Sequence, residues 1–95
     1  MAYSIINSSN ETIVWDVTDG SQVIWTSGKL LPGEQRTERH RGSFGIADLL
    51  TIQVPQYDPS GNPNGTFGWG GVLVHKDGRV TVYGDWNFDV RRNSE

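Results

Sequence analysis

The chain lacks cysteine, which excludes disulfide bonds and thiolate metal sites as sources of stability. It also has no apolar run near the roughly 18 residues that a membrane-spanning helix needs, so a soluble protein is expected. No segment repeats apolar residues at i, i+3, i+4 and i+7 beyond two turns, and little or no helix is therefore predicted. With 95 residues, the chain is long enough for one domain. Its four Trp, three Tyr and three Phe are the main material for a core.

The chain also lacks a concentrated basic face. Its net charge is −3, with acidic and basic residues interspersed, which argues against a nucleic-acid partner. The basic segment from Arg36 to Arg41 is diluted by Glu38 and is interpreted as a solvated edge strand. The N-terminus has no signal-peptide pattern, so cytoplasmic residence or non-classical secretion is expected. On that view the Asn-x-Ser/Thr sequences, at Asn7, Asn10 and Asn64, are turn chemistry rather than glycosylation sites.

The chain does contain segments in which apolar and polar residues alternate, and turn residues separate these segments. This pattern predicts an all-β fold, a small antiparallel β-sandwich or barrel of seven to eight short strands. Strands are expected at Tyr3–Asn7, Thr12–Val17, Gln22–Thr26, Gln35–His40, Leu49–Val54, Val72–Lys76, Arg79–Tyr83 and Trp86–Val90, followed by a frayed tail.

Two Asp-Gly pairs, at Asp19-Gly20 and Asp77-Gly78, predict hairpins. In the second hairpin, Val72 and Val74 are expected to pair with Val80 and Val82. Alternation also predicts that the strand tryptophans Trp15, Trp25 and Trp86 belong to the core.

Between Val54 and Val72 lie seventeen residues, PQYDPSGNPNGTFGWGG, with almost no hydrophobic periodicity. A loop of that length in a small domain is usually functional when it is ordered. It combines aromatic rings that could stack on a sugar with amides and a carboxylate that could bind hydroxyls. The predicted ligand-binding residues are Trp69, Tyr57, Asp58, Asn62, Asn64 and Phe67. Because single sites of this kind bind weakly, a homo-oligomer is expected to supply avidity.

The sequence evidence for a catalytic site or a metal site is weaker than the evidence for a ligand-binding loop. His40, Ser43 and Asp48 allow a nucleophilic triad, but no Gly-x-Ser-x-Gly elbow surrounds the serine, and an enzyme is not predicted. His75 is interpreted as a surface or rim residue. Asp58, Ser60, Asn62 and Asn64 alternate and resemble the first half of a calcium loop. If Ser60 is the first ligand, however, Gly71 stands where the bidentate Glu would be required. No metal or cofactor is therefore predicted.

The segment Gly42–Val54, GSFGIADLLTIQV, resembles a run in the fungal immunomodulatory proteins. The matching residues are Gly45, Ile46, Ala47, Asp48, Thr51, Ile52, Gln53 and Val54, and Asp58-Pro59 follows them as in that family. The resemblance implies a lectin-like protein with an immunoglobulin-type or fibronectin-type sandwich. It carries over no binding residue, and the family's N-terminal dimerisation helix has no counterpart in MAYSIINSS.

The leading hypothesis is a non-catalytic carbohydrate-binding module with a glycan or glycoprotein partner. A second hypothesis is a protein-interaction or assembly module, that is, an inhibitor, effector or structural subunit. A third is a membrane-active defence protein, because Trp and Tyr favour the lipid interface. The aromatic segment lacks neighbouring Lys or Arg, which lowers its attraction to anionic lipid.

Overall fold

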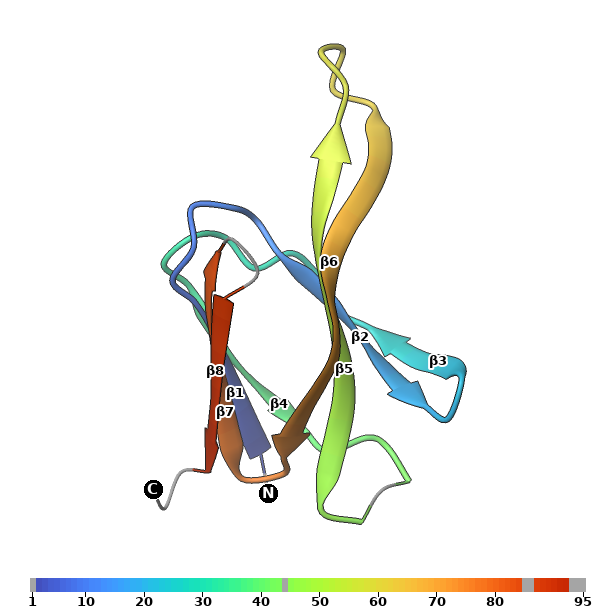
Figure 1. Cartoon of the computed structure of the whole chain (residues 1–95), viewed down its shortest axis with the longest axis vertical. Helices are drawn as coiled ribbons and strands as arrows, with labels where there is room; N and C mark the ends of the chain where they lie inside the picture. The colour runs from blue at the N-terminus through green and yellow to red at the C-terminus, as the bar shows by residue number, and fades with distance from the viewer. Residues whose placement is uncertain (1, 44, 85–86, 93–95) are drawn as a thin grey trace.

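The computed structural model describes residues 2–43, 45–84 and 87–92, and it describes the backbone alone at Phe67, Trp69 and Gly70. The described residues form an all-β fold of eight strands (Figure 1), which confirms the predicted fold class. The strands are β1 (Ala2–Asn7), β2 (Val14–Asp19), β3 (Gln22–Thr26), β4 (Gln35–Arg39), β5 (Ala47–Tyr57), β6 (Pro63–His75), β7 (Gly78–Gly84) and β8 (Asn87–Arg92). Trp86 and the last three residues of the predicted frayed tail lie outside the described residues.

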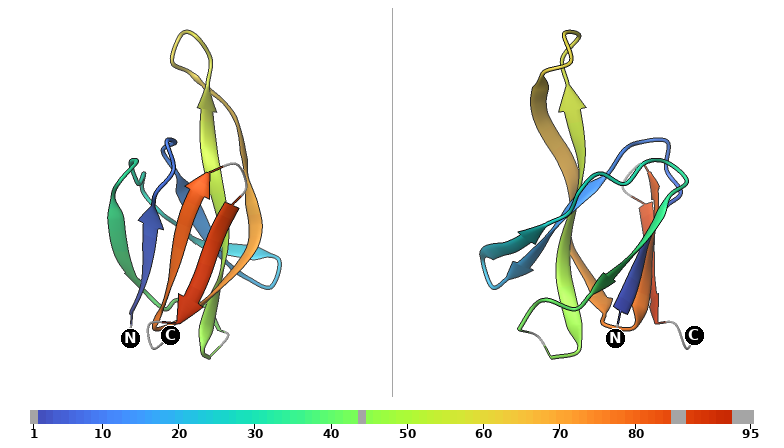
Figure 2. Two further views of the ribbon diagram at one scale, coloured as in Figure 1. Left: turned by 60° about the vertical axis from the view of Figure 1, so that its left-hand side comes forward. Right: turned by 180° about the vertical axis from the view of Figure 1, so that it is seen from behind.

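The strands make two four-stranded sheets, in the orders β4-β1-β7-β8 and β3-β2-β5-β6. Figure 2 shows the two sheets packed as layers. All strand pairs are antiparallel except β1–β7, which is parallel, so the first sheet is mixed. A parallel pair needs a long connection, and here the chain between β1 and β7 supplies it by building the whole second sheet and the edge strand β4 of the first.

The core lies between the sheets and follows the alternation in the sequence. In β2, Trp15 and Val17 are fully buried, as is the preceding Ile13. Trp25 is half-buried and packs on Trp15 with ring centroids 6.5 Å apart, while its neighbour Val23 is 52% exposed. Trp15 is therefore confirmed as core, and Trp25 lies at the core's edge. The other fully buried apolar side chains include Tyr3, Ile5, Leu50, Ile52, Val72, Val74, Val80 and Val82.

The two Asp-Gly pairs behave differently. Asp19-Gly20 closes the β2–β3 hairpin as predicted, with Gly20 at φ +67°. The predicted second hairpin is wrong, because β6 pairs with β5 while β7 pairs with β1 and β8. The turn at Asp77-Gly78 instead carries the chain from one sheet to the other. The valines of the two strands consequently belong to one buried core cluster, to which each sheet contributes a pair, and they share no ladder.

The predicted seventeen-residue loop is also wrong. Most of it is strand: β5 continues to Tyr57, β6 begins at Pro63, and the two form one long hairpin. The alternation is interrupted because β6 has two register shifts, where two residues oppose one residue of β5. Gly65 and Gly71 lie at these bulges with φ of +85° and +71°, which L side chains rarely adopt. At each bulge the face to which odd- and even-numbered residues point is exchanged. The alternation of apolar and polar residues is therefore broken, and the sequence does not show one continuous strand.

The far end of this hairpin projects beyond the sandwich (Figures 1 and 2). The pairing of β2 with β5 ends at the Val14–Gln53 pair, whereas β5 and β6 continue to the Tyr57–Pro63 pair. We call residues 55–66 the arm. It contributes to the longest dimension of the molecule, which measures 42 Å against 27 and 19 Å.

The predicted edge position of β4 is confirmed, since among the described strands β4 pairs with β1 alone. Two arginines, one on β4 and one just after it, contact tryptophan rings of the other sheet. The guanidinium of Arg36 lies 5.6 Å from the Trp15 ring centroid, and that of Arg41, just after β4, lies 3.8 Å from the Trp25 ring centroid. These cation–π contacts cross from one sheet to the other and cover one side of the core.

Candidate functional site

The tip of the arm is a tight turn that Asp58 holds in place. The backbone N–H of Asp58 donates to Asn62 O at 2.9 Å, and Gly61 N–H donates to Asp58 O at 2.9 Å. The Asp58 carboxylate also accepts the N–H groups of Ser60 and Asn62, each at 2.9 Å through Oδ1. Gly61 has φ +86°. This arrangement is an Asx-type turn, for which Asp and Gly are suited.

The tip presents one aromatic ring and two amides to solvent. Tyr57 is 48% exposed, and the Lys29 ammonium lies 5.4 Å from its ring centroid. Asn62 and Asn64 are exposed on the opposite limb of the hairpin. An open aromatic ring beside amide donors and acceptors is suited to a polar ligand that has an apolar face, such as a sugar ring.

The structure separates the six predicted ligand residues into two groups. Tyr57, Asp58, Asn62 and Asn64 come together at the tip. The backbones of Phe67 and Trp69 lie further along β6, opposite Val54 and Ile52. Trp69 lies six positions beyond Pro63 along the strand, a distance of about 20 Å. The roles predicted for the Phe67 and Trp69 rings fall on side chains outside those described.

The resemblance of this segment to a calcium loop has a structural explanation. The oxygen-rich residues build the tip turn, and Asp58 Oδ1 already accepts two backbone N–H groups. Within the described part of the chain, no group of three or more His, Cys, Asp or Glu residues is placed to hold a metal ion.

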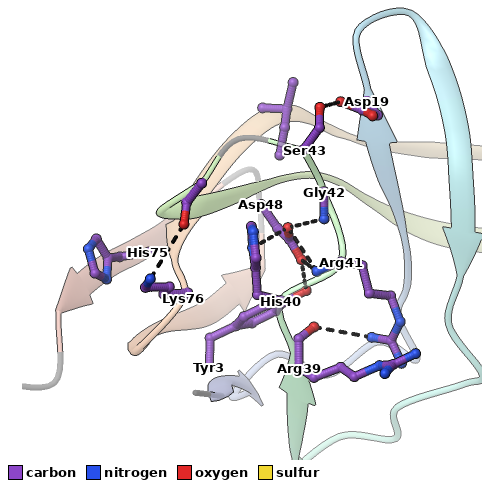
Figure 3. Close-up of polar contacts among 12 residues, drawn as sticks. Tyr3, Asp19, Arg39, His40, Arg41, Gly42, Ser43, Asp48, His75 and Lys76 are labelled. Atoms are coloured by element: carbon purple, nitrogen blue, oxygen red, sulfur yellow. Dashed lines mark hydrogen bonds and ion pairs between the residues drawn. The ribbon is translucent and has the colours of Figure 1, made fainter.

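A second polar centre surrounds Asp48, which is fully buried at the start of β5. Its carboxylate accepts the Tyr3 hydroxyl at 2.8 Å and the N–H groups of Arg41 and Gly42, at 3.0 and 2.7 Å (Figure 3). His40 Nδ1 lies 2.8 Å from Asp48 Oδ1, which makes a hydrogen bond when Nδ1 carries the proton. Together these contacts fasten β1 and the β4–β5 connection to β5.

The triad that the sequence allows is not assembled. His40 and Asp48 pair, but the Ser43 hydroxyl donates to Asp19, at the end of β2, and points away from the Asp48 centre in Figure 3. His75 is half-buried and pairs with Asp77, so it lies at the rim.

Burial, followed by the hydrogen bond to Asp48 and the charge of that carboxylate, raises the pKa of Tyr3 far above its ordinary value. The phenol therefore stays neutral and acts as a donor. This centre joins β1, the β4–β5 connection and β5 in the folded state.

Asn7 is a second buried polar residue with a full set of partners. Its amide N–H₂ donates to Glu11 O at 2.7 Å and Leu30 O at 3.0 Å, and its Oδ1 accepts the N–H of Ser9 at 3.0 Å. The turn chemistry predicted for its Asn-x-Ser sequence is thus present. A glycan on this nitrogen is incompatible with the buried, hydrogen-bonded amide.

Comparison of the chain with family models, curated proteins and solved structures finds no match. The resemblance of Gly42–Val54 to the fungal immunomodulatory proteins therefore stays a prediction. Among the residues described, no helix is long and apolar enough to cross a membrane. The fold and the tip together define a β-sandwich that presents a projecting hairpin with a polar tip.

Proposed function

We propose that the protein is a non-catalytic binding module that recognises carbohydrate with the tip of the arm. The observation that carries this proposal is the projection of Tyr57, Asn62 and Asn64 on a hairpin that extends beyond the sandwich. A site of this shape reaches into a glycan layer without requiring the sandwich to approach it.

Each tip residue has a distinct role in the proposal. The Tyr57 ring stacks on the apolar face of a sugar, and the Lys29 ammonium beside it orients a hydroxyl or an acidic sugar. The amides of Asn62 and Asn64 exchange hydrogen bonds with hydroxyls. Asp58 keeps the turn closed and positions Asn62, rather than binding sugar directly.

A glycan array with the labelled protein tests the proposal. Replacement of Tyr57 by Ala is expected to abolish the response, because the stacking surface is lost. The matched control is Tyr83→Ala, which removes another exposed ring, 56% accessible against 48% for Tyr57, from the other sheet and should leave binding unchanged. No glycan response from the parent, or equal losses in the two variants, would reject the tip as a carbohydrate site.

A pair of substitutions at one position tests the role of Asp58. Asp58→Asn keeps an oxygen acceptor for the two backbone N–H groups and is expected to retain most of the binding. Asp58→Ala removes the acceptor, opens the turn and is expected to weaken binding markedly. Equal loss in both variants would indicate that the carboxylate charge itself contacts the ligand.

A further inference from the structure

The two sides of the sandwich are closed to different extents. On the β3–β4 side, arginines stacked on Trp15 and Trp25 cover the core. On the other side, β6 and β8 are the edge strands of their sheets and lie next to each other without pairing. We call this side the β6–β8 seam.

Apolar residues that belong to the core face are exposed at the seam. Val90 pairs with Val80, and Phe88 pairs with Val82, across the β7–β8 ladder. Directly paired residues share a face of the sheet, so Val90 and Phe88 lie on the side that buries their partners. They are nevertheless 37% and 40% exposed. Leu73 alternates with the buried Val72 and Val74, so it lies on the outer face of β6, where it is 56% exposed.

A pocket of about 210 Å³ opens at one end of the seam, where β5 begins and β6 and β8 end. Its lining is mainly apolar and includes two arginines and a histidine. The residues are Ile46, Ala47, Leu73, His75, Val90, Arg91 and Arg92.

The backbone of β6 beside this pocket is suited to a peptide. Lys76 N–H donates to Ile46 O at 2.8 Å, and His75 is the register partner of Ala47. Because hydrogen-bonded and non-bonded pairs alternate along an antiparallel ladder, the N–H and C=O groups of Leu73 and His75 point away from β5. Among the described strands none pairs with this edge of β6. An extended chain could take these groups up, whereas a small apolar ligand would leave them to water.

The charge around the pocket indicates the composition of that chain. Segments 75–79 and 89–92 contain four Lys or Arg and two Asp, a net charge of +2 in a chain whose total is −3. Arg91 pairs with Asp89, and Arg92 is exposed at the rim. A large apolar residue flanked by Asp or Glu therefore complements both the pocket and its rim.

We propose that the β6–β8 seam binds an extended acidic segment of a partner protein. The segment adds as a strand to the edge of β6 and inserts one apolar side chain between Leu73 and Val90. The seam lies at the opposite end of β6 from the arm tip, so this interaction is independent of the proposed carbohydrate site.

The test is a selection of eight-residue peptides displayed on phage against the whole protein. The expected result is enrichment of peptides with a large apolar residue next to Asp or Glu. Binding of a selected synthetic peptide should weaken about tenfold or more in Leu73→Glu and in Arg92→Glu. The matched controls are Ile24→Glu on β3 and Arg39→Glu on β4, which make the same changes at exposed positions of other edge strands and should bind as the parent does.

Amide hydrogen exchange distinguishes strand addition from other modes of binding. The amides of Leu73 and His75 are expected to exchange rapidly in the free protein and slowly in the peptide complex. Selected peptides that bind without this protection, or that bind Leu73→Glu as well as the parent, would overturn the proposal. Protection of both amides by self-association alone, seen as a dimer in sedimentation, would assign the seam to a second copy instead.

Discussion

At the scale of single residues, the fold depends on a few buried polar groups that complete one another's hydrogen bonds. Asp48 is the clearest case, since one carboxylate satisfies donors from Tyr3, Arg41 and Gly42. Such a group contributes little net stability when satisfied, but removing it leaves buried donors unpaired.

Asp48→Ala is therefore expected to lower the free energy of unfolding by about 3–5 kcal/mol, measured by urea denaturation. The control is Ser43→Ala, which removes an exposed hydrogen bond to Asp19 from the neighbouring connection and should cost less than about 1 kcal/mol. Equal costs would contradict the assignment of Asp48 as the centre of this network.

Tyr3 should make the protein sensitive to alkali. Its raised pKa means that the folded state keeps the phenolic proton while the unfolded chain releases it above about pH 10. The stabilisation is fully present below that pH and is lost as the pH rises, at about 1.4 kcal/mol per pH unit. Urea denaturation at about pH 8 and pH 11 should show this slope in the parent and a shallower one in Tyr3→Phe. A slope that is the same in both proteins would remove Tyr3 as its cause.

At the scale of strands, alternation in the sequence predicts most element positions but not their partners. It places Gln22–Thr26 at its observed bounds and the Asp19-Gly20 hairpin correctly, because both depend on local chemistry. The same alternation also indicates that one polar residue, Asp48, faces the core. Asp48 is in phase with Leu50, Ile52 and Val54, and all four are buried. A polar residue on the core face was thus readable from the sequence, whereas its partners Tyr3 and His40 lie on segments that only the topology brings close.

The β5–β6 hairpin and the first sheet show where local patterns fail. Two bulges in β6 interrupt the period-two alternation. The pairing of β7 with β1 depends on a contact between segments near the two ends of the chain. The turn at the arm tip is readable from the sequence because the Asp and Gly chemistry that forms it is local. The separation of the tip residues from the Trp69 backbone could not be seen without the register.

Gly68 is required by the close approach of β6 to β5. A Cβ there would lie 2.8 Å from Gln53 Cα, and closer still to the carbonyl oxygen of Ile52. Gly68→Ala is expected to destabilise the protein by about 2 kcal/mol or more, because two backbones must move apart. Gly45→Ala, where an added Cβ meets nothing within 4 Å, should leave the melting temperature within about 2 °C of the parent. A small effect at Gly68 would show that the two strands lie further apart there.

At the scale of the whole molecule, the sandwich and the arm are expected to be separable. The core lies between the two sheets, while from Gln56 to Thr66 the described side chains are exposed or, at Asp58, half-buried. Removal of Gln56–Gly65 and closure of the Pro55–Thr66 pair with Asn-Gly, a turn suited to two-residue hairpins, should preserve the fold. The melting temperature is then expected to change by less than about 5 °C, since little apolar surface is lost from the core.

Glycan binding should disappear while peptide binding at the β6–β8 seam persists, and both can be measured on the same shortened protein. Loss of the fold would show that the arm stabilises the sandwich, and retained glycan binding would place the carbohydrate site on the sandwich itself.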